Sequence, residues 1–292
     1  MFSRKLKITT TTIALGLALT ACSGGSKDAN TIKIGTTEAS ADYWKPFEAA
    51  AKEKGITIEP VSFSDYTQVD PALAQNQTDL NLFQHLAFLA DYNVKNNQNL
   101  TPIGSTYVTP LSLYSKKHTQ VSQIPQDGTI AIPNDPTNQA RALLLLQKAG
   151  LLKLNGGGNI LSTPADISSE GKKVKVQAID AAQTPANLPA VDAAVINNDK
   201  AQDAKIDPNS AIFKDDPNSD QAQPYINVIV SRANDKDNEN YKKVVEAYKE
   251  PEVQQAVKAQ SKNTSVLVNK TPAELEQVLN QQQEIIKQAS QK

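Results

Sequence analysis

Residues 129–150 read TIAIPNDPTNQARALLLLQKAG, and this stretch contains the pattern that decides the fold. Its first four residues, Thr129–Ile132, form a short apolar run that is typical of a buried strand. Pro136 and Thr137 then indicate the start of a helix over residues 137–149, with Thr137 as its cap and Gly150 as its C-terminal stop. A buried strand that leads directly into a helix predicts an α/β protein with parallel strands.

The same alternation of strand-like and helix-like runs continues in both directions along the chain. Further strands are predicted at residues 31–36, 56–63, 80–83, 106–115, 174–179, 193–196 and 225–231. Further helices are predicted over residues 43–54 and 86–96, and two helices close the chain, over residues 240–250 and from Thr271 onward. No unit of about 20 to 50 residues repeats, which argues against solenoids and propellers.

The composition excludes several classes of protein. The 292 residues include 30 basic and 31 acidic side chains, a nearly neutral balance in a chain long enough for one large or two medium domains. No basic block predicts a nucleic-acid partner, and a single cysteine cannot form an internal disulfide. Two separated histidines and the absence of phosphate-loop, dinucleotide, nucleophile-elbow and zinc motifs predict no metal and no cofactor, and they disfavour an enzyme.

The N-terminus has the layout of an export signal. Basic residues lie near the start, an apolar run follows over residues 13–19, and small residues precede Cys22. The sequence Leu19-Thr20-Ala21-Cys22 resembles the bacterial lipoprotein processing box, which implies cleavage after residue 21 and lipidation of Cys22. Residues 22–30 then form a small, polar, flexible tether. We therefore expect a protein that is anchored to a membrane by lipid and faces the periplasm or the extracellular side.

Arg141 is placed by the predicted cap in about the first turn of its helix, where a cation opposes the helix dipole. The free N–H groups of a helix start favour anions, and a guanidinium added there makes a fork that fits a carboxylate. Asn138 lies three residues earlier on the same helical face. The alternative is an ordinary ion pair between Arg141 and a nearby acid such as Asp135.

Aromatic residues gather around a predicted strand-to-helix turn. Phe83 and His85 end the strand, Phe88 follows, and Tyr66 precedes it. Such side chains can form a flat-walled pocket for an alkyl or thioether group, although ordinary core packing is the alternative.

Two asparagines, Asn197 and Asn227, lie beside or within apolar strand-like runs. An amide in such a place needs hydrogen-bond partners, from the backbone or from a polar ligand. Asn197 also follows a predicted parallel strand, at the end where α/β sheets bind ligands. Together, a guanidinium, an apolar wall and two amides suit a small zwitterion with an apolar tail.

Several segments resemble the MetQ/NlpA methionine-binding lipoproteins. They are FSDY at 63–66, FQH at 83–85, LYSKK at 113–117, AIPNDPTN at 131–138, RALLLLQKAGLL at 141–152, VDAAVIN at 191–197 and YINVIVSR at 225–232. The resemblance implies two α/β lobes joined by two crossover segments, near residues 107–113 and 225–230, with the ligand in the cleft between them. The first lobe would comprise residues 31–109 and 231–292, and the second residues 110–230. It also implies delivery of methionine to an ABC importer built from a membrane subunit and an ATPase subunit.

Carried over by position, the resemblance assigns a role to each candidate residue. Arg141 would bind the ligand carboxylate, and Asn197 and Asn227 would hold its amino and carboxylate groups, with Asn138 nearby. The thioether pocket would be lined by Tyr66, Phe83, His85 and Phe88.

The chain departs from the family pattern around the expected cleft. Phe88 stands where the family usually has tyrosine, residues 196–201 read INNDKA instead of INGNYA, and residues 183–186 read QTPA instead of the frequent QLPR. L-Methionine, D-methionine, methionine-containing dipeptides and related amino acids therefore stay open as ligands. A surface lipoprotein without a transport role and an extracytoplasmic hydrolase stay open as functions, as does the choice between inner and outer membrane.

Overall fold

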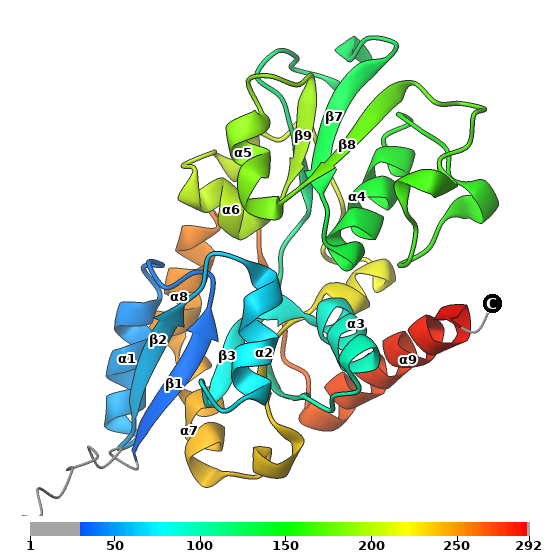
Figure 1. Cartoon of the computed structure of the whole chain (residues 1–292). Coiled ribbons are helices and arrows are strands. Elements are labelled where there is room, and N and C mark those ends of the chain that lie inside the picture. The colour runs from blue at the N-terminus through cyan, green and yellow to red at the C-terminus, as the bar shows by residue number, and fades with distance from the viewer. Residues whose placement is uncertain (1–29, 291–292) are drawn as a thin grey trace, which may run out of the picture.

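The computed structural model describes residues 30–290, which form two lobes, each built around its own five-stranded sheet (Figure 1). The expected signal peptide at residues 1–21, Cys22 and most of the expected tether lie outside these residues. The sheet of lobe 1 has the order β2-β1-β3-β11-β4, and that of lobe 2 the order β10-β6-β9-β7-β8. The predicted two-lobe α/β architecture is confirmed.

Each sheet draws its five strands from separate parts of the chain. Lobe 1 contains β1 (Thr31–Thr36), β2 (Thr57–Ser62), β3 (Leu80–His85), β4 (Thr101–Ser105) and β11 (Asn227–Ser231). Lobe 2 contains β6 (Ser112–Tyr114), β7 (Gly128–Pro133), β8 (Val174–Ile179), β9 (Ala193–Ile196) and β10 (Phe213–Lys214). A separate pair joins β5 (Tyr107–Val108) to β12 (Val266–Leu267).

Both sheets are mixed, whereas the sequence pattern predicted parallel strands throughout. β1 runs parallel to β2 and β3, but β11 is antiparallel to β3 and β4. In lobe 2, β7 runs parallel to β8 and β9, but β6 is antiparallel to β9 and β10. The reversed strands β6 and β11 are each the first strand that the chain forms after it crosses from one lobe to the other.

The chain returns from lobe 2 to lobe 1 before residue 230, where the sequence analysis placed the end of lobe 2. β11 is hydrogen-bonded between β3 and β4, so residues 227–231 are part of the sheet of lobe 1. The apolar run over residues 225–231 predicted a strand but not the sheet that it joins, because the partners of a strand lie far away in the sequence.

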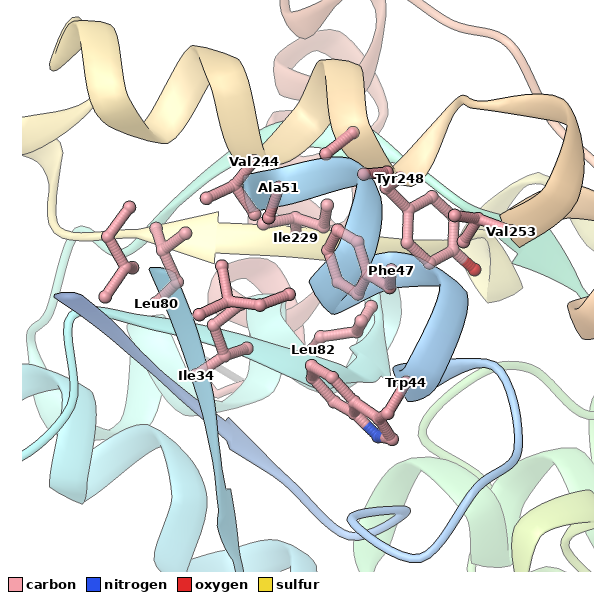
Figure 2. Close-up of a cluster of buried hydrophobic side chains, with 14 of the residues drawn as sticks. Ile34, Trp44, Phe47, Ala51, Leu80, Leu82, Ile229, Val244, Tyr248 and Val253 are labelled. Atoms are coloured by element: carbon pink, nitrogen blue, oxygen red, sulfur yellow. The ribbon is translucent and has the colours of Figure 1, made fainter. Parts of the chain in front are cut away.

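Helices cover both faces of the first sheet. One face packs against α1 (Trp44–Glu53), α7 (Glu239–Tyr248) and α8 (Pro251–Gln260), and the other against α2 (Val69–Ala74), α3 (Leu86–Asn96) and α9 (Pro272–Ser290). Because successive strand residues point to opposite faces, Ile229 of β11 joins the first cluster, and Val228 and Val230 join the second. Figure 2 shows the first cluster, where the rings of Phe47 and Tyr248 meet edge to face with centroids 5.3 Å apart.

Two helices of lobe 1 were not predicted. The helix α8 lies between the two that were expected to close the chain, and it buries only Val253 and Val257 on an otherwise polar surface. Such a narrow apolar stripe gives little periodic signal. The helix α2 has only six residues, too few for a period of 3.6 to be visible.

Lobe 2 contains α4 (Pro136–Lys148), α5 (Thr184–Asn187) and α6 (Asn198–Asp203). The cap of α4 is Asp135, not Thr137: its carboxylate accepts a hydrogen bond from the backbone N–H of Asn138 at 3.1 Å, and Pro136 occupies the first helical position. Arg141 therefore lies in the second turn of α4. None of the helices between residues 30 and 290 is long and apolar enough to span a bilayer.

Candidate ligand-binding cleft

A cleft between the two lobes is lined where β3, β7 and β9 end and α3, α4 and α6 begin. Its walls include every side chain that the sequence singled out as ligand-binding: Tyr66, Phe83, His85, Phe88, Asn138, Arg141, Asn197 and Asn227. They also include Glu38, Gln84, Tyr107, Thr109, Asn198 and Asp199. Strand ends converge on this edge of both sheets, which explains why residues distant in sequence meet here.

Arg141 is buried in the cleft wall and is held from three sides. Its Nε donates to Oδ2 of Asp215 at 2.9 Å, and its Nη2 donates to the carbonyl oxygen of Thr109 at 2.9 Å. Its guanidinium carbon lies 4.1 Å from the centroid of the Tyr225 ring. The ion pair with Asp135 that the sequence left open is therefore wrong, because Asp135 caps the helix and Asp215 is the partner. A guanidinium has five N–H donors, so these contacts leave donors for a ligand anion.

A chain of polar side chains crosses the cleft from lobe 1 to lobe 2. His85 ends β3 and caps α3, and its Nδ1 accepts a hydrogen bond from the backbone N–H of Phe88 at 3.1 Å. Burial, and then the charge of Arg141, lower the pKa of His85 to about 3, so the ring is neutral and carries its proton on Nε2. Nε2 lies 3.3 Å from Oδ1 of Asn138, which also accepts from Nδ2 of Asn197 at 2.9 Å. Oδ1 of Asn197 is buried and has no hydrogen-bond partner among residues 30–290.

Asn227 lies on the lobe 1 side of these hydrogen-bonded side chains. It is the first residue of β11 and pairs with His85 across the antiparallel ladder. Its Nδ2 is 3.5 Å from the carbonyl oxygen of Tyr225, and its side chain is half-buried at the cleft. The structure thus brings both predicted asparagines to one site, one from each lobe.

The aromatic residues form one packed wall in lobe 1. The ring centroid of Phe83 lies 6.3 Å from that of Tyr66 and 5.6 Å from that of Phe88, and Tyr66 and Phe88 are 6.2 Å apart. Phe83 and Phe88 are only half-buried, and none of the three belongs to the hydrophobic clusters of the described residues. The wall therefore presents apolar surface to the cleft, which disfavours ordinary core packing.

The family follows from the sequence as a whole. Residues 32–268 match the sequence model of the NlpA lipoprotein. This chain belongs to the NlpA lipoprotein family. This match confirms the predicted family, and six of the seven segments that carry the resemblance contribute a residue to the cleft lining.

Relatives of this NlpA family member include proteins with a stated ligand. The D-methionine-binding lipoprotein MetQ of Salmonella typhi is 39% identical over 245 residues, which is 82% of this chain and 89% of the relative. The substrate-binding protein of a methionine transporter from Streptococcus pneumoniae has a similar structure, with a TM-score of 0.77, 38% identity, and coverage of 82% of this chain and 96% of the other. A nutrient-binding protein from Burkholderia cenocepacia bound to methionine has a TM-score of 0.75 and 39% identity over 81% of this chain and 99% of its own.

Sequence reasoning missed two carboxylates in the cleft of this NlpA family member. Glu38 follows β1, where the hydrogen bond from Trp44 Nε1 to its carbonyl oxygen (2.8 Å) fixes the loop. Asp199 lies in the first turn of α6 and accepts hydrogen bonds from the hydroxyl groups of Tyr66 and Thr37, at 2.5 and 3.2 Å. The available signals were position after a parallel strand for Glu38 and the departing INNDKA segment for Asp199.

Among residues 30–290, no group of histidine, cysteine, aspartate and glutamate side chains is arranged to hold a metal ion. The polar groups of the cleft are instead a guanidinium, amides and carboxylates, which suit an organic ligand with charges of both signs.

Proposed function

We propose that this protein is a lipid-anchored, extracytoplasmic substrate-binding protein that captures methionine and delivers it to an ABC importer. One observation carries the proposal: a buried guanidinium in lobe 2 faces the same cleft as an apolar aromatic wall in lobe 1. A carboxylate and a thioether tail need these two surfaces at once. The relatives named above, whose names state methionine binding or methionine transport, support the same ligand for this chain.

Each part of the cleft has a role in this function. The N–H donors of Arg141 that Asp215 and Thr109 do not use bind the ligand carboxylate. Asn197 and Asn227 hold the amino and carboxylate groups, and Asn138 fixes the amide of Asn197. The methionine side chain lies against the wall of Tyr66, Phe83 and Phe88, with the neutral His85 ring completing it. Sulfur against aromatic ring edges is a favourable contact.

The rest of the chain fits transport and not catalysis. The signal at residues 1–21 directs export, lipid on Cys22 anchors the protein, and residues 22–30 let the folded lobes reach a membrane partner. The partner is the importer's membrane subunit with its ATPase. The cleft contains one neutral histidine within a fixed hydrogen-bond chain, and we assign no catalytic residue.

The function is tested by ligand stabilisation and by Arg141 variants. A thermal-shift panel of the amino acids and short methionyl peptides should give an increase in Tm with methionine, because a ligand that binds only the folded state stabilises it. In calorimetry, Arg141→Ala should lower methionine affinity by about 2 kcal/mol or more, since it removes one half of a buried charged contact. Arg141→Lys retains the charge but not the forked guanidinium, so its methionine affinity should lie between those of the unaltered protein and Arg141→Ala.

Two controls separate binding from folding. Lys148→Ala removes a positive charge from the exposed end of the same helix and should leave the affinity unchanged. Circular dichroism reports whether Arg141→Ala still folds after Asp215 loses its partner. No stabilisation by any amino acid or peptide would refute the transport function, and a folded Arg141→Ala variant with full affinity would refute the carboxylate role.

A further inference from the structure

The cleft lining contains more acidic than basic side chains. Among the described residues that line it, Glu38 and Asp199 are carboxylates, whereas Arg141 is the single cation and is already paired with Asp215. Lys200 contacts Asp199, with Nζ 3.2 Å from Oδ2, but does not line the cleft. With these partners counted, three carboxylates (Glu38, Asp199 and Asp215) stand against two cations (Arg141 and Lys200), an excess of one negative charge in a place where both lobes shield it from water.

The two carboxylates come from opposite lobes, and their surroundings consist of hydrogen-bond donors. Oε2 of Glu38 accepts a hydrogen bond from the hydroxyl of Tyr107 at 3.0 Å. Both oxygens of Asp199 accept from hydroxyl groups of lobe 1. Burial, followed by the charge of Asp199, raises the pKa of Glu38 to about 7, so a further cation beside the pair would favour its ionised form.

A third acceptor lies two residues before Asp199. Oδ1 of Asn197 is buried and no described residue donates a hydrogen bond to it, although Nδ2 of the same side chain donates to Asn138. An unpaired buried acceptor costs free energy that a donor from a ligand would recover. Asn197 and Asp199 flank the start of α6 and both line the cleft from lobe 2, and Glu38 lines the same cleft from lobe 1.

We infer that Asp199 and Glu38, together with Oδ1 of Asn197, bind a primary ammonium group of the ligand and make that group a condition of tight binding. The inference rests on the proposed function, because it concerns the same cleft. An ammonium group has three donors and no acceptor, which matches a wall of acceptors with excess negative charge. The ligand then lies with its carboxylate at Arg141 and its ammonium at Asp199.

The ammonium group has two chemical sources. It is the α-ammonium of free methionine, or it is the N-terminal ammonium of a dipeptide that ends in methionine. In both cases the carboxylates recognise the same group, and the distance between ammonium and carboxylate differs between the ligands.

Calorimetry with three probes tests the inference: methionine, glycyl-methionine, and methylthiobutanoate, which is methionine without its amino group. The unaltered protein should bind methionine or glycyl-methionine at least about tenfold more tightly than methylthiobutanoate. Asp199→Asn preserves an acceptor for Tyr66 but removes the charge. It should lower the affinity for the ligand that carries the ammonium group by about tenfold and leave the affinity for methylthiobutanoate unchanged. Glu38→Gln should also lower the affinity for the ligand that carries the ammonium group. Whichever of methionine and glycyl-methionine loses more affinity in these variants is the source of the ammonium group.

Asp203→Asn is the matched control, because it removes a carboxylate from the same helix but outside the cleft lining. It should preserve the ratio of affinities between the probes. Equal binding of methionine and methylthiobutanoate would overturn the inference while the proposed function stands. So would an Asp199→Asn variant that loses affinity equally for both, since that result marks Asp199 as structural. Failure of all three probes to bind would refute the proposed function and this inference with it.

Discussion

Asp70 offers a test of how the lobe 1 side of the cleft is held. It lies in α2 with 1% of its surface exposed, and its Oδ1 accepts hydrogen bonds from Nδ2 of Asn81 at 2.8 Å and Nε2 of Gln84 at 2.5 Å. Its Oδ2 is buried and has no hydrogen-bond partner within the part of the chain that the structure describes. Burial raises the pKa of Asp70 from 3.8 to about 7, against the opposing effect of these two hydrogen bonds.

The raised pKa makes stability depend on pH in a defined direction. Between pH 3.8 and about 7 the carboxyl is neutral in the folded protein and ionised in the unfolded chain, so the folded state binds more protons. The free energy of unfolding therefore falls as pH rises through this window, by about 1.4 kcal/mol per pH unit, and is level above it. From pH 5 to pH 8 the loss from Asp70 is about 3 kcal/mol, because the last unit adds nothing.

Urea unfolding of the ligand-free protein at pH 5 and pH 8 measures this loss. Asp70→Asn removes the titration and retains an oxygen for Asn81 and Gln84, so its stability should fall by about 3 kcal/mol less than that of the unaltered protein. Glu38, whose pKa is also raised to about 7, contributes equally to both proteins and cancels. Asp237→Asn, at an exposed carboxyl, should behave as the unaltered chain. Identical losses in the unaltered protein and Asp70→Asn would refute the reasoning.

Two further substitutions test packing and closure. In Gly104→Ala the new Cβ would lie 2.7 Å from Cγ1 of Val245, where α7 packs on β4. The free energy of unfolding, measured with urea, should therefore fall by about 1–3 kcal/mol. Unchanged stability would mean that α7 moves away from β4 without cost. Tyr66→Phe removes a hydrogen bond to the Asp199 carboxylate across the cleft and should weaken methionine binding about tenfold in calorimetry, while the ring contacts remain. Unchanged affinity would show that this bond does not stabilise the closed lobes.

The elements with distinct start and stop residues were predictable from the sequence. The helix α9 begins as expected, because Thr271 and Glu274 form the reciprocal capping bonds: the N–H of Thr271 donates to Oε2 of Glu274 at 2.8 Å, and the N–H of Glu274 to Oγ1 of Thr271 at 3.3 Å. The cap of α4 was predicted two residues too late because Asp135 and Thr137 are both good caps, and only the structure shows that Asp135 accepts the backbone N–H of Asn138.

Candidate site residues were predictable where a local rule applies, and their partners were not. Arg141 and Asn197 stand out because a cation near a helix start and an amide at a strand end each conflict with local preference. The partner of Arg141 lies 74 residues away in the sequence, and Thr37 is 162 residues from Asp199. The first pair is set by the folding of lobe 2 and the second by the meeting of the two lobes, and no spacing rule within a helix or strand encodes either.

The division of the site between the lobes couples binding to closure. Lobe 2 supplies Arg141 and Asp199, and lobe 1 supplies the aromatic wall, so neither lobe alone contains a complete site. The ion pair between Lys262 and Asp207 (3.0 Å) joins the two lobes outside the cleft lining and stabilises the closed arrangement without touching a ligand. Since apparent affinity scales with the fraction of molecules that are closed, this ion pair contributes to the affinity through lobe closure, whereas Arg141 contributes through contact with the ligand. A substitution at Lys262, outside the cleft lining, should therefore change affinity for every ligand by the same factor, whereas one at Arg141 should affect only those with a carboxylate.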